Sequence, residues 1–170
     1  MWIYLLRHGI AEEPNPGTDD AIRSLTSEGR VRLTAAATSW QKMVSTPELV
    51  LTSPYLRARE TATIFAKAVG YHDELRDEST AMPHSNIEDT LAVLEGEMLS
   101  QTKSLALVGH EPHLGYLLGS LLTGHSHLSI PLGRGMLVGL ETESTTNVIA
   151  GLRFSLTQRH AARLNQEPRS

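Results

Sequence analysis

Short apolar runs recur along the sequence and are separated by longer segments in which apolar residues have a helical spacing. Three runs are continuous enough to predict strands that are buried on both faces: residues 2–6, 49–52 and 104–109. Each of these runs is followed by a segment with a helical pattern. Strands that alternate with helices predict an α/β sandwich with a largely parallel sheet.

Helices are predicted between and after these strands. The first is expected to begin after Thr26 as the N-cap, and its apolar residues fall on one face. The second covers residues 55–69 and ends at Gly70, a residue that commonly terminates helices. Two more are expected over residues 86–99 and 112–122.

The last third of the chain has a different pattern. Residues 136–140 and 148–156 are two further strand candidates, and the segment 141–147 between them has the composition of a turn. Residues 157–170 are polar and are expected to form a loose tail. We therefore expect one catalytic domain over residues 1–156, since the chain contains no internal repeat or linker.

Composition narrows the class of protein. With 170 residues the chain suits one domain with a proper core, and its net charge of −4 gives no general reason to bind nucleic acid or an anionic membrane. The absence of cysteine excludes disulfides and thiolate chemistry. No apolar segment has the length of a signal peptide's apolar region or of a membrane span. A cytoplasmic enzyme is the expectation.

Basic and imidazole side chains stand directly after the predicted strands. Arg7, His8 and Gly9 follow the first strand, Arg57 lies in the first turn of the helix after the second, and His110 follows the third. Ligands of open α/β sheets usually bind at the carboxyl ends of the strands. The predicted fold therefore brings two histidines and two arginines to one edge of the sheet.

This set of residue types suits phosphoryl transfer. A phosphoryl group in transfer spreads negative charge over three oxygens, which planar guanidinium groups bind bidentately. A neutral imidazole can attack phosphorus and form a covalent intermediate. Gly9 would let the backbone come close to the phosphate. Taken alone, each residue is better explained as a surface, core or turn residue, and only their common position favours a site.

The motifs around these residues resemble the histidine phosphatase (phosphoglycerate-mutase-like) superfamily, and more narrowly its SixA branch of phosphohistidine phosphatases. The matching segments are RHGIAE at 7–12, DAIRSLTSEG at 20–29, SPYLRARETA at 53–62 and VGHEPHLG at 108–115. They are spread over the first two-thirds of the chain. The resemblance implies a three-layer fold with helices on both faces of the sheet, and an enzyme without metal or other cofactor.

The resemblance also implies roles for single residues. His8 is expected to be the nucleophile, Arg7 and Arg57 the phosphate clamps, and His110 the second histidine of the phosphate pocket. Relatives that act on phosphate esters use a carboxylic acid to protonate the leaving group. Glu78 matches that position roughly, and a solvated loop glutamate is an equally good interpretation of it.

Three functions remain open on this basis. The first is removal of phosphate from histidine of a signalling or phosphotransfer protein, with that protein and phosphate as the ligands. The second is hydrolysis of small phosphomonoesters, and the third is a phosphoprotein-binding module without turnover. The interval between Gly70 and the third strand holds little beyond one helix, so an open site is expected, which favours the first function.

One other pattern competes as a functional site. His125 and His127 are two potential metal ligands in a loop, but no carboxylate follows at a suitable spacing. An exposed polar loop is the better interpretation of this pair.

Overall fold

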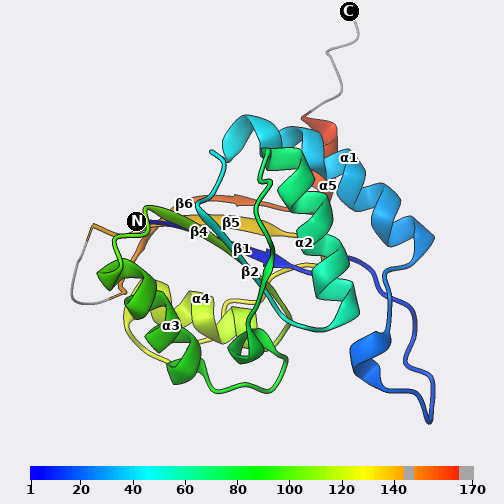
Figure 1. Ribbon diagram of the computed structural model, residues 1–170, viewed down its shortest axis with the longest axis horizontal. Helices are drawn as coiled ribbons and strands as arrows, with labels where there is room; N and C mark the ends of the chain where they lie inside the picture. Colours follow the sequence, from blue (N-terminus) through cyan, green and yellow to red (C-terminus); the bar gives the residue numbers. More distant parts are fainter. Residues whose placement is uncertain (144–147, 165–170) are drawn as a thin grey trace, which may run out of the picture.

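The computed structural model describes residues 1–143 and 148–164. Its centre is a six-stranded sheet with the strand order β3-β2-β4-β1-β5-β6 (Figure 1). The first four strands in this order run parallel, and the last two are antiparallel to their neighbours. The strands are β1 (Trp2–Arg7), β2 (Leu49–Thr52), β3 (Arg76–Asp77), β4 (Ser104–Gly109), β5 (Leu137–Glu141) and β6 (Gly151–Leu156). The predicted largely parallel sheet is confirmed.

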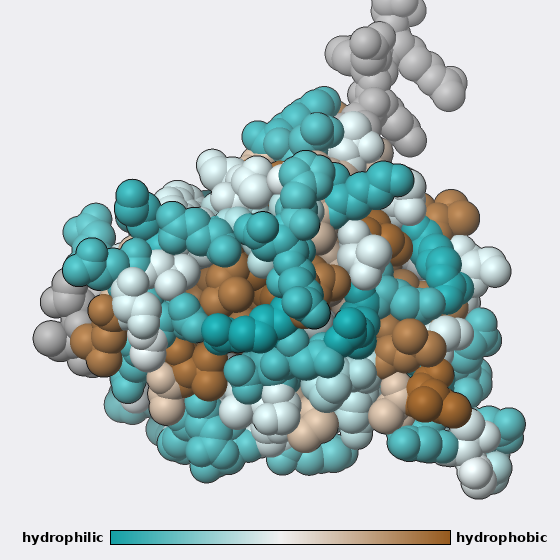
Figure 2. Space-filling view, in the orientation of Figure 1, coloured by the Kyte–Doolittle hydropathy of each residue, from teal (hydrophilic) through white to brown (hydrophobic). Residues whose placement is uncertain are grey.

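Helices cover both faces of this sheet, as the resemblance implied. Figure 1 shows α1 (Ser27–Met43), α2 (Leu56–Val69) and α5 (Gln158–Arg163) on one face, and α3 (Ile87–Leu99) with α4 (His113–Thr123) on the other. This arrangement is that of a three-layer α/β sandwich. Hydrophilic residues cover most of the face seen in Figure 2, and hydrophobic residues form small separate groups on it.

The alternation of side chains along β1 produces two separate cores. Tyr4 and Leu6 pack into the cluster beneath α1 and α2, whereas Ile3 and Leu5 pack into the cluster beneath α4. All four side chains are buried. Successive side chains of a strand point to opposite faces, so a continuous apolar run is what a strand covered on both faces requires.

The ends of the first two helices follow the predicted signals. Thr26 Oγ1 accepts a hydrogen bond of 2.8 Å from the Gly29 amide at the start of α1. Gly70 adopts the left-handed conformation, with φ of 72°, at the end of α2. These local contacts satisfy backbone groups that a helix leaves without partners at its ends.

The C-terminal segment differs from its prediction. The expectation of a loose tail is wrong for residues 158–163, which form α5 with Thr157 as the N-cap. Ala161 is fully buried against α1, and its carbonyl oxygen accepts a hydrogen bond of 2.6 Å from Ser39 Oγ. Burial of one apolar face on α1 stabilises a helix too short to be recognised from its periodicity. Residues 165–170 of the predicted tail lie outside the described residues.

Smaller differences concern the last two strands. The strand expected over 148–156 begins at Gly151, and part of the expected turn, residues 144–147, lies outside the described residues. Across the described part of the chain, no helix has the length and apolar character needed to cross a membrane.

Candidate active site

Three parallel strands end at the same edge of the sheet and carry the predicted residues there. The register pairs Arg7 with Gly109 and Thr52 with Val108, so β1, β2 and β4 terminate side by side. The His8 amide donates to the Gly109 carbonyl oxygen at 3.1 Å, which extends the pairing beyond β1. A cleft of about 520 Å³ opens at this edge; its lining is Arg7, His8, Ala11, Glu13, Pro14, Asp20, Arg23, Tyr55, Arg57, Pro83, His84, His110, Glu111 and Arg134.

The two predicted histidines face each other in this cleft. The centroids of the His8 and His110 rings are 4.9 Å apart. His8 Nδ1 lies 2.7 Å from the carbonyl oxygen of Gly9, which can only accept, so Nδ1 carries the proton. The lone pair of a neutral His8 ring is therefore on Nε2. His110 Nε2 contacts Ser53 Oγ at 2.8 Å.

Both rings are neutral at neutral pH. Burial lowers the pKa of His8 to about 4, and the charges of Arg57 and Arg7 contribute to the same shift. Burial, followed by the interaction with His8, lowers the pKa of His110 to about 2. A low dielectric and adjacent cations disfavour the imidazolium form. Neutrality preserves the Nε2 lone pair that a nucleophile requires.

The two predicted phosphate clamps are held by the protein around them. Arg57 is only 4% exposed and donates to Asp20 twice, from Nη1 to the carbonyl oxygen at 2.7 Å and from Nη2 to Oδ2 at 2.8 Å. Arg7 Nη1 donates to the Leu132 carbonyl oxygen at 2.6 Å. The Nε atoms of both arginines are buried and have no hydrogen-bond partner among the described residues. Buried donors of this kind suit an anionic ligand.

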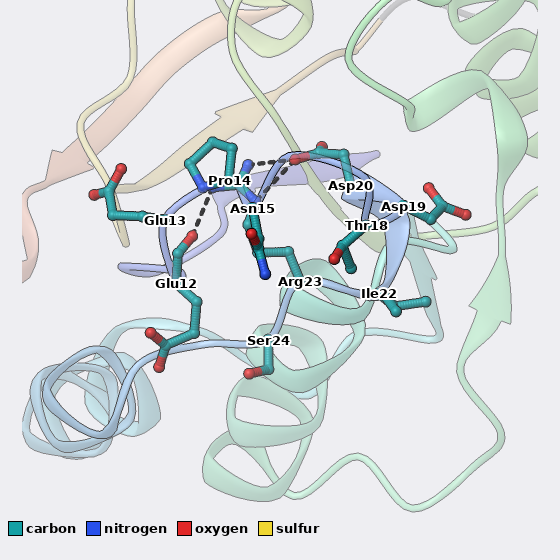
Figure 3. A pocket seen from close by; sticks show the side chains of 10 residues that line it. All are labelled: Glu12, Glu13, Pro14, Asn15, Thr18, Asp19, Asp20, Ile22, Arg23 and Ser24. Carbon is teal, nitrogen blue, oxygen red and sulfur yellow. Dashed lines mark hydrogen bonds and ion pairs between the residues drawn. The ribbon is translucent and has the colours of Figure 1, made fainter.

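The loop between β1 and α1 orients Arg57 through Asp20, and Asp20 is in turn held by Arg23. Arg23 Nε donates to Asp20 Oδ1 at 2.8 Å, and Arg23 Nη1 donates to the Glu12 carbonyl oxygen at 2.8 Å (Figure 3). Burial raises the pKa of Asp20, but its bonds with Arg57 and Arg23 outweigh this effect and lower it below its ordinary value. Asp20 is thus an ionised link between two arginines of the cleft.

The structure explains the glycine at position 9 by packing and not by the predicted close approach of the backbone to phosphate. Its amide donates to Thr61 Oγ1 at 3.2 Å, and Gly9 is not among the residues that line the cleft. A Cβ atom at this position would lie 2.6 Å from Leu33 Cδ1. Close packing of the loop on α1 accounts for the glycine here.

Of the two glutamates near this edge of the sheet, only one lines the cleft. Glu78 does not line the cleft; its Oε1 accepts from the Thr80 amide at 3.1 Å and caps the short 3₁₀ helix η2 (Ser79–Ala81). Glu111 does line the cleft, and burial raises its pKa above the ordinary value, an effect that the hydrogen bond from the Leu132 amide and the charge of Arg7 partly offset. A raised pKa suits a carboxyl group that must deliver a proton.

Several cleft residues were not assigned a role from the sequence. Asp20 and Arg23 lie in a matched motif, but no pattern indicated that their side chains turn back toward Arg57. Glu111 had a usable signal, because it follows His110 directly at the end of a buried strand. Arg134 lies between two glycines before a strand and offered no signal of its own.

The rival metal pair forms no larger cluster. The rings of His125 and His127 are 5.5 Å apart on the surface. Within residues 1–143 and 148–164, no group of three or more histidine, cysteine, aspartate or glutamate side chains is placed to hold a metal ion. The exposed-loop interpretation of this pair fits the structure.

A largely parallel α/β sheet with paired histidines and arginines at its strand ends suits a protein of the phosphoryl-transfer class. Comparison with known proteins is consistent with this class. The model of the histidine phosphatase superfamily (branch 1) matches residues 3–80. An uncharacterized protein of Picosynechococcus sp. is 34% identical over 143 residues, which cover 84% of this chain and 86% of the relative. The chain belongs to the histidine phosphatase superfamily and is a phosphatase of that superfamily.

Solved structures share the fold along nearly the whole chain. The structure of the protein histidine phosphatase SixA complexed with tungstate superposes with a TM-score of 0.83 at 20% identity, covering 94% of this chain and 98% of that chain. The native structure of a mycobacterial glucosyl-3-phosphoglycerate phosphatase superposes with a TM-score of 0.64 at 18% identity, covering 89% and 96%. At these identities the likeness establishes the three-layer fold.

Proposed function

We propose that this phosphatase removes phosphate from a phosphorylated histidine of another protein, with His8 as the nucleophile. The observation that carries the proposal is the contact of His8 Nδ1 with the Gly9 carbonyl oxygen, which leaves the Nε2 lone pair free in an arginine-lined cleft. The partner is a phosphotransfer protein of a cytoplasmic signalling relay.

The reaction proceeds in two displacements. His8 Nε2 attacks phosphorus, a new phosphorus–nitrogen bond forms, and the bond to the substrate imidazole breaks as that ring leaves with a proton on one nitrogen. Water then attacks the phosphorus of phospho-His8, phosphate is released, and the neutral His8 ring is restored. Arg7, Arg57 and His110 bind the oxygens whose charge increases in each transition state.

The energetics favour a phosphohistidine substrate. The first displacement exchanges one phosphorus–nitrogen bond for another, so it is close to balanced. The leaving imidazole is neutralised by a proton on its own ring and requires no acid from the enzyme. The segment between Gly70 and β4 contains only β3, η2 and α3 as regular elements, which leaves the cleft open to a projecting side chain. The fold of SixA supports the same choice.

A second function is supported by Glu111. Hydrolysis of a small phosphomonoester expels an alkoxide, and a carboxylic acid in the cleft would protonate it. Glu111 lines the cleft beside His110 and has a raised pKa. The mycobacterial structure with this fold is described as a glucosyl-3-phosphoglycerate phosphatase. A binding module without turnover ranks last, because both histidines are present and face each other.

The test compares phosphate release from a phosphohistidine protein, a phosphoserine peptide and a sugar phosphate. We expect the phosphohistidine protein to be strongly preferred. We also expect a short reaction to label the wild-type enzyme with phosphate in a bond stable to base and labile to acid, and His8→Ala to remove both label and turnover. Full turnover by His8→Ala would overturn the mechanism, and faster cleavage of the sugar phosphate would favour the second function.

A further inference from the structure

The loop before β5 is fastened to the catalytic strand. The Gly135 amide donates to the carbonyl oxygens of Arg7 and His8, each at 3.1 Å. Arg7 Nη1 donates to the Leu132 carbonyl oxygen, and the Leu132 amide donates to Glu111 Oε1 at 3.0 Å. These contacts fix the backbone of the loop relative to the nucleophile and to the wall of the cleft. A side chain that this loop presents to the cleft therefore extends from a backbone position that is fixed relative to His8.

The side chain presented there is that of Arg134. It lines the cleft and is exposed, and no ion pair or hydrogen bond engages its guanidinium group in the described part of the chain. The other cleft arginines are engaged, Arg23 and Arg57 with Asp20 and Arg7 with a carbonyl oxygen. Arg134 thus differs from its three neighbours in having no acceptor among the residues that the structure describes.

The charge of Arg134 acts on its neighbour Arg7. Burial is the main cause that lowers the pKa of Arg7; Glu111 opposes this effect, and the charge of Arg134 adds to it. The mutual repulsion of two cations is relieved when an anion binds near them. Since Arg7 and Arg57 lie deeper and already serve the phosphoryl group, the exposed Arg134 is available to a second anionic group.

We propose that Arg134 is a specificity-determining residue that pairs with a carboxylate on the surface of the phosphorylated protein, beside its phosphohistidine. This inference rests on the proposed function. A guanidinium group recognises a carboxylate through two parallel hydrogen bonds. Because the backbone of Arg134 is held in place, this pairing restricts how the partner protein is oriented on the cleft. A rim charge of this kind acts on association more than on the chemical step.

The experiment measures kcat and KM for Arg134→Gln with two substrates, a phosphohistidine protein and phosphoramidate, which has no carboxylate. We expect KM for the protein to rise about three- to tenfold with kcat nearly constant, so that the preference for protein over phosphoramidate falls by the same factor. Arg134→Lys should lose part of the preference, because the charge remains and the fork is lost. Added salt should weaken the wild type more than Arg134→Gln.

Arg159→Gln is the matched control, because it removes the same charge from an exposed arginine of α5 that does not line the cleft. It should retain the wild-type preference. Equal losses on both substrates would overturn the inference and make Arg134 a phosphate ligand. An unchanged KM for the protein would also overturn it. Failure of the proposed function has a different signature, since wild-type enzyme would then not hydrolyse the phosphohistidine protein.

Discussion

Asp20 Oδ2 lies 2.8 Å from Arg57 Nη2, although 37 positions separate the two residues in the chain. The Asp20 carbonyl oxygen accepts a second hydrogen bond, from Arg57 Nη1. The loop after β1 thereby holds an arginine of α2 in one orientation within the cleft. Two bonds from a planar group restrict it far more than one, and a guanidinium group aligned in advance loses less entropy when phosphate binds.

Substitution of Arg57 tests this arrangement. Arg57→Lys keeps the charge but cannot make the two parallel contacts, so we expect a loss of about tenfold or more in kcat/KM. Because Arg57 is almost fully buried, the substitution should also lower the free energy of unfolding, by about 1 kcal/mol. Kinetics and urea denaturation of the same sample measure both effects. Wild-type kinetics in Arg57→Lys would assign Arg57 to structure alone.

Acidification is expected to destabilise the folded protein. Burial lowers the pKa of His8 and His113 to about 4 and that of His110 to about 2, whereas an unfolded histidine titrates near 6.5. The unfolded state therefore binds more protons, and stability falls as the pH decreases through about 6.5 towards the folded pKa values. Urea midpoints should be highest above about pH 7 and clearly lower at about pH 5.

The control for this titration is an exposed histidine. His160→Gln should show the same decrease in urea midpoint between the two pH values as the wild type, since His160 is exposed on α5. His110→Gln should show a smaller decrease, whatever its absolute stability. The same decrease in urea midpoint in His110→Gln and in the wild type would show that His110 does not contribute to the pH dependence of stability.

Glu78 and Glu111 are expected to differ in their effect on ester hydrolysis. Glu78→Gln should barely alter turnover of phosphohistidine, and it should also leave any ester hydrolysis unchanged, because Glu78 caps η2 outside the cleft. Glu111→Gln keeps an oxygen that can accept from the Leu132 amide but loses the acidic proton. We expect a loss of about a hundredfold for any sugar phosphate and little change for phosphohistidine. Steady-state rates of both variants on both substrates measure this, and loss of ester cleavage in Glu78→Gln would return the acid role to Glu78.

Chelation tests the proposal of a metal-independent mechanism. In the proposed mechanism, Arg7 and Arg57 supply the positive charge that a divalent ion provides in other phosphatases. Activity on a phosphohistidine protein should therefore survive dialysis against a chelator with less than about a twofold change. Loss of activity with recovery on one specific metal would favour a metal site, and His125→Ala with His127→Ala would then show whether that pair binds it.

The sequence alone determined the layered fold and the principal site. Continuous apolar runs predict strands that are buried on both faces. The helical segments between them predict crossover connections, which make the strands parallel, and the carboxyl ends of parallel strands meet at one edge of the sheet. His8, Arg57 and His110 immediately follow or nearly follow such strands, so their convergence is a consequence of chain direction. The packing of β1 into one core on each face of the sheet follows from its continuous apolar run in the same way.

Tertiary structure decided which charged side chains enter the cleft and how they are oriented. Asp20 and Arg23 lie in a loop whose path depends on contacts with α2, and such contacts leave no periodic signal in the sequence. The choice of Glu111 over Glu78 depends on side-chain direction at two loop positions, which spacing does not encode. The packing of α5 on α1 was equally invisible, because a helix of six residues is stabilised by burial of one face and not by its own propensity.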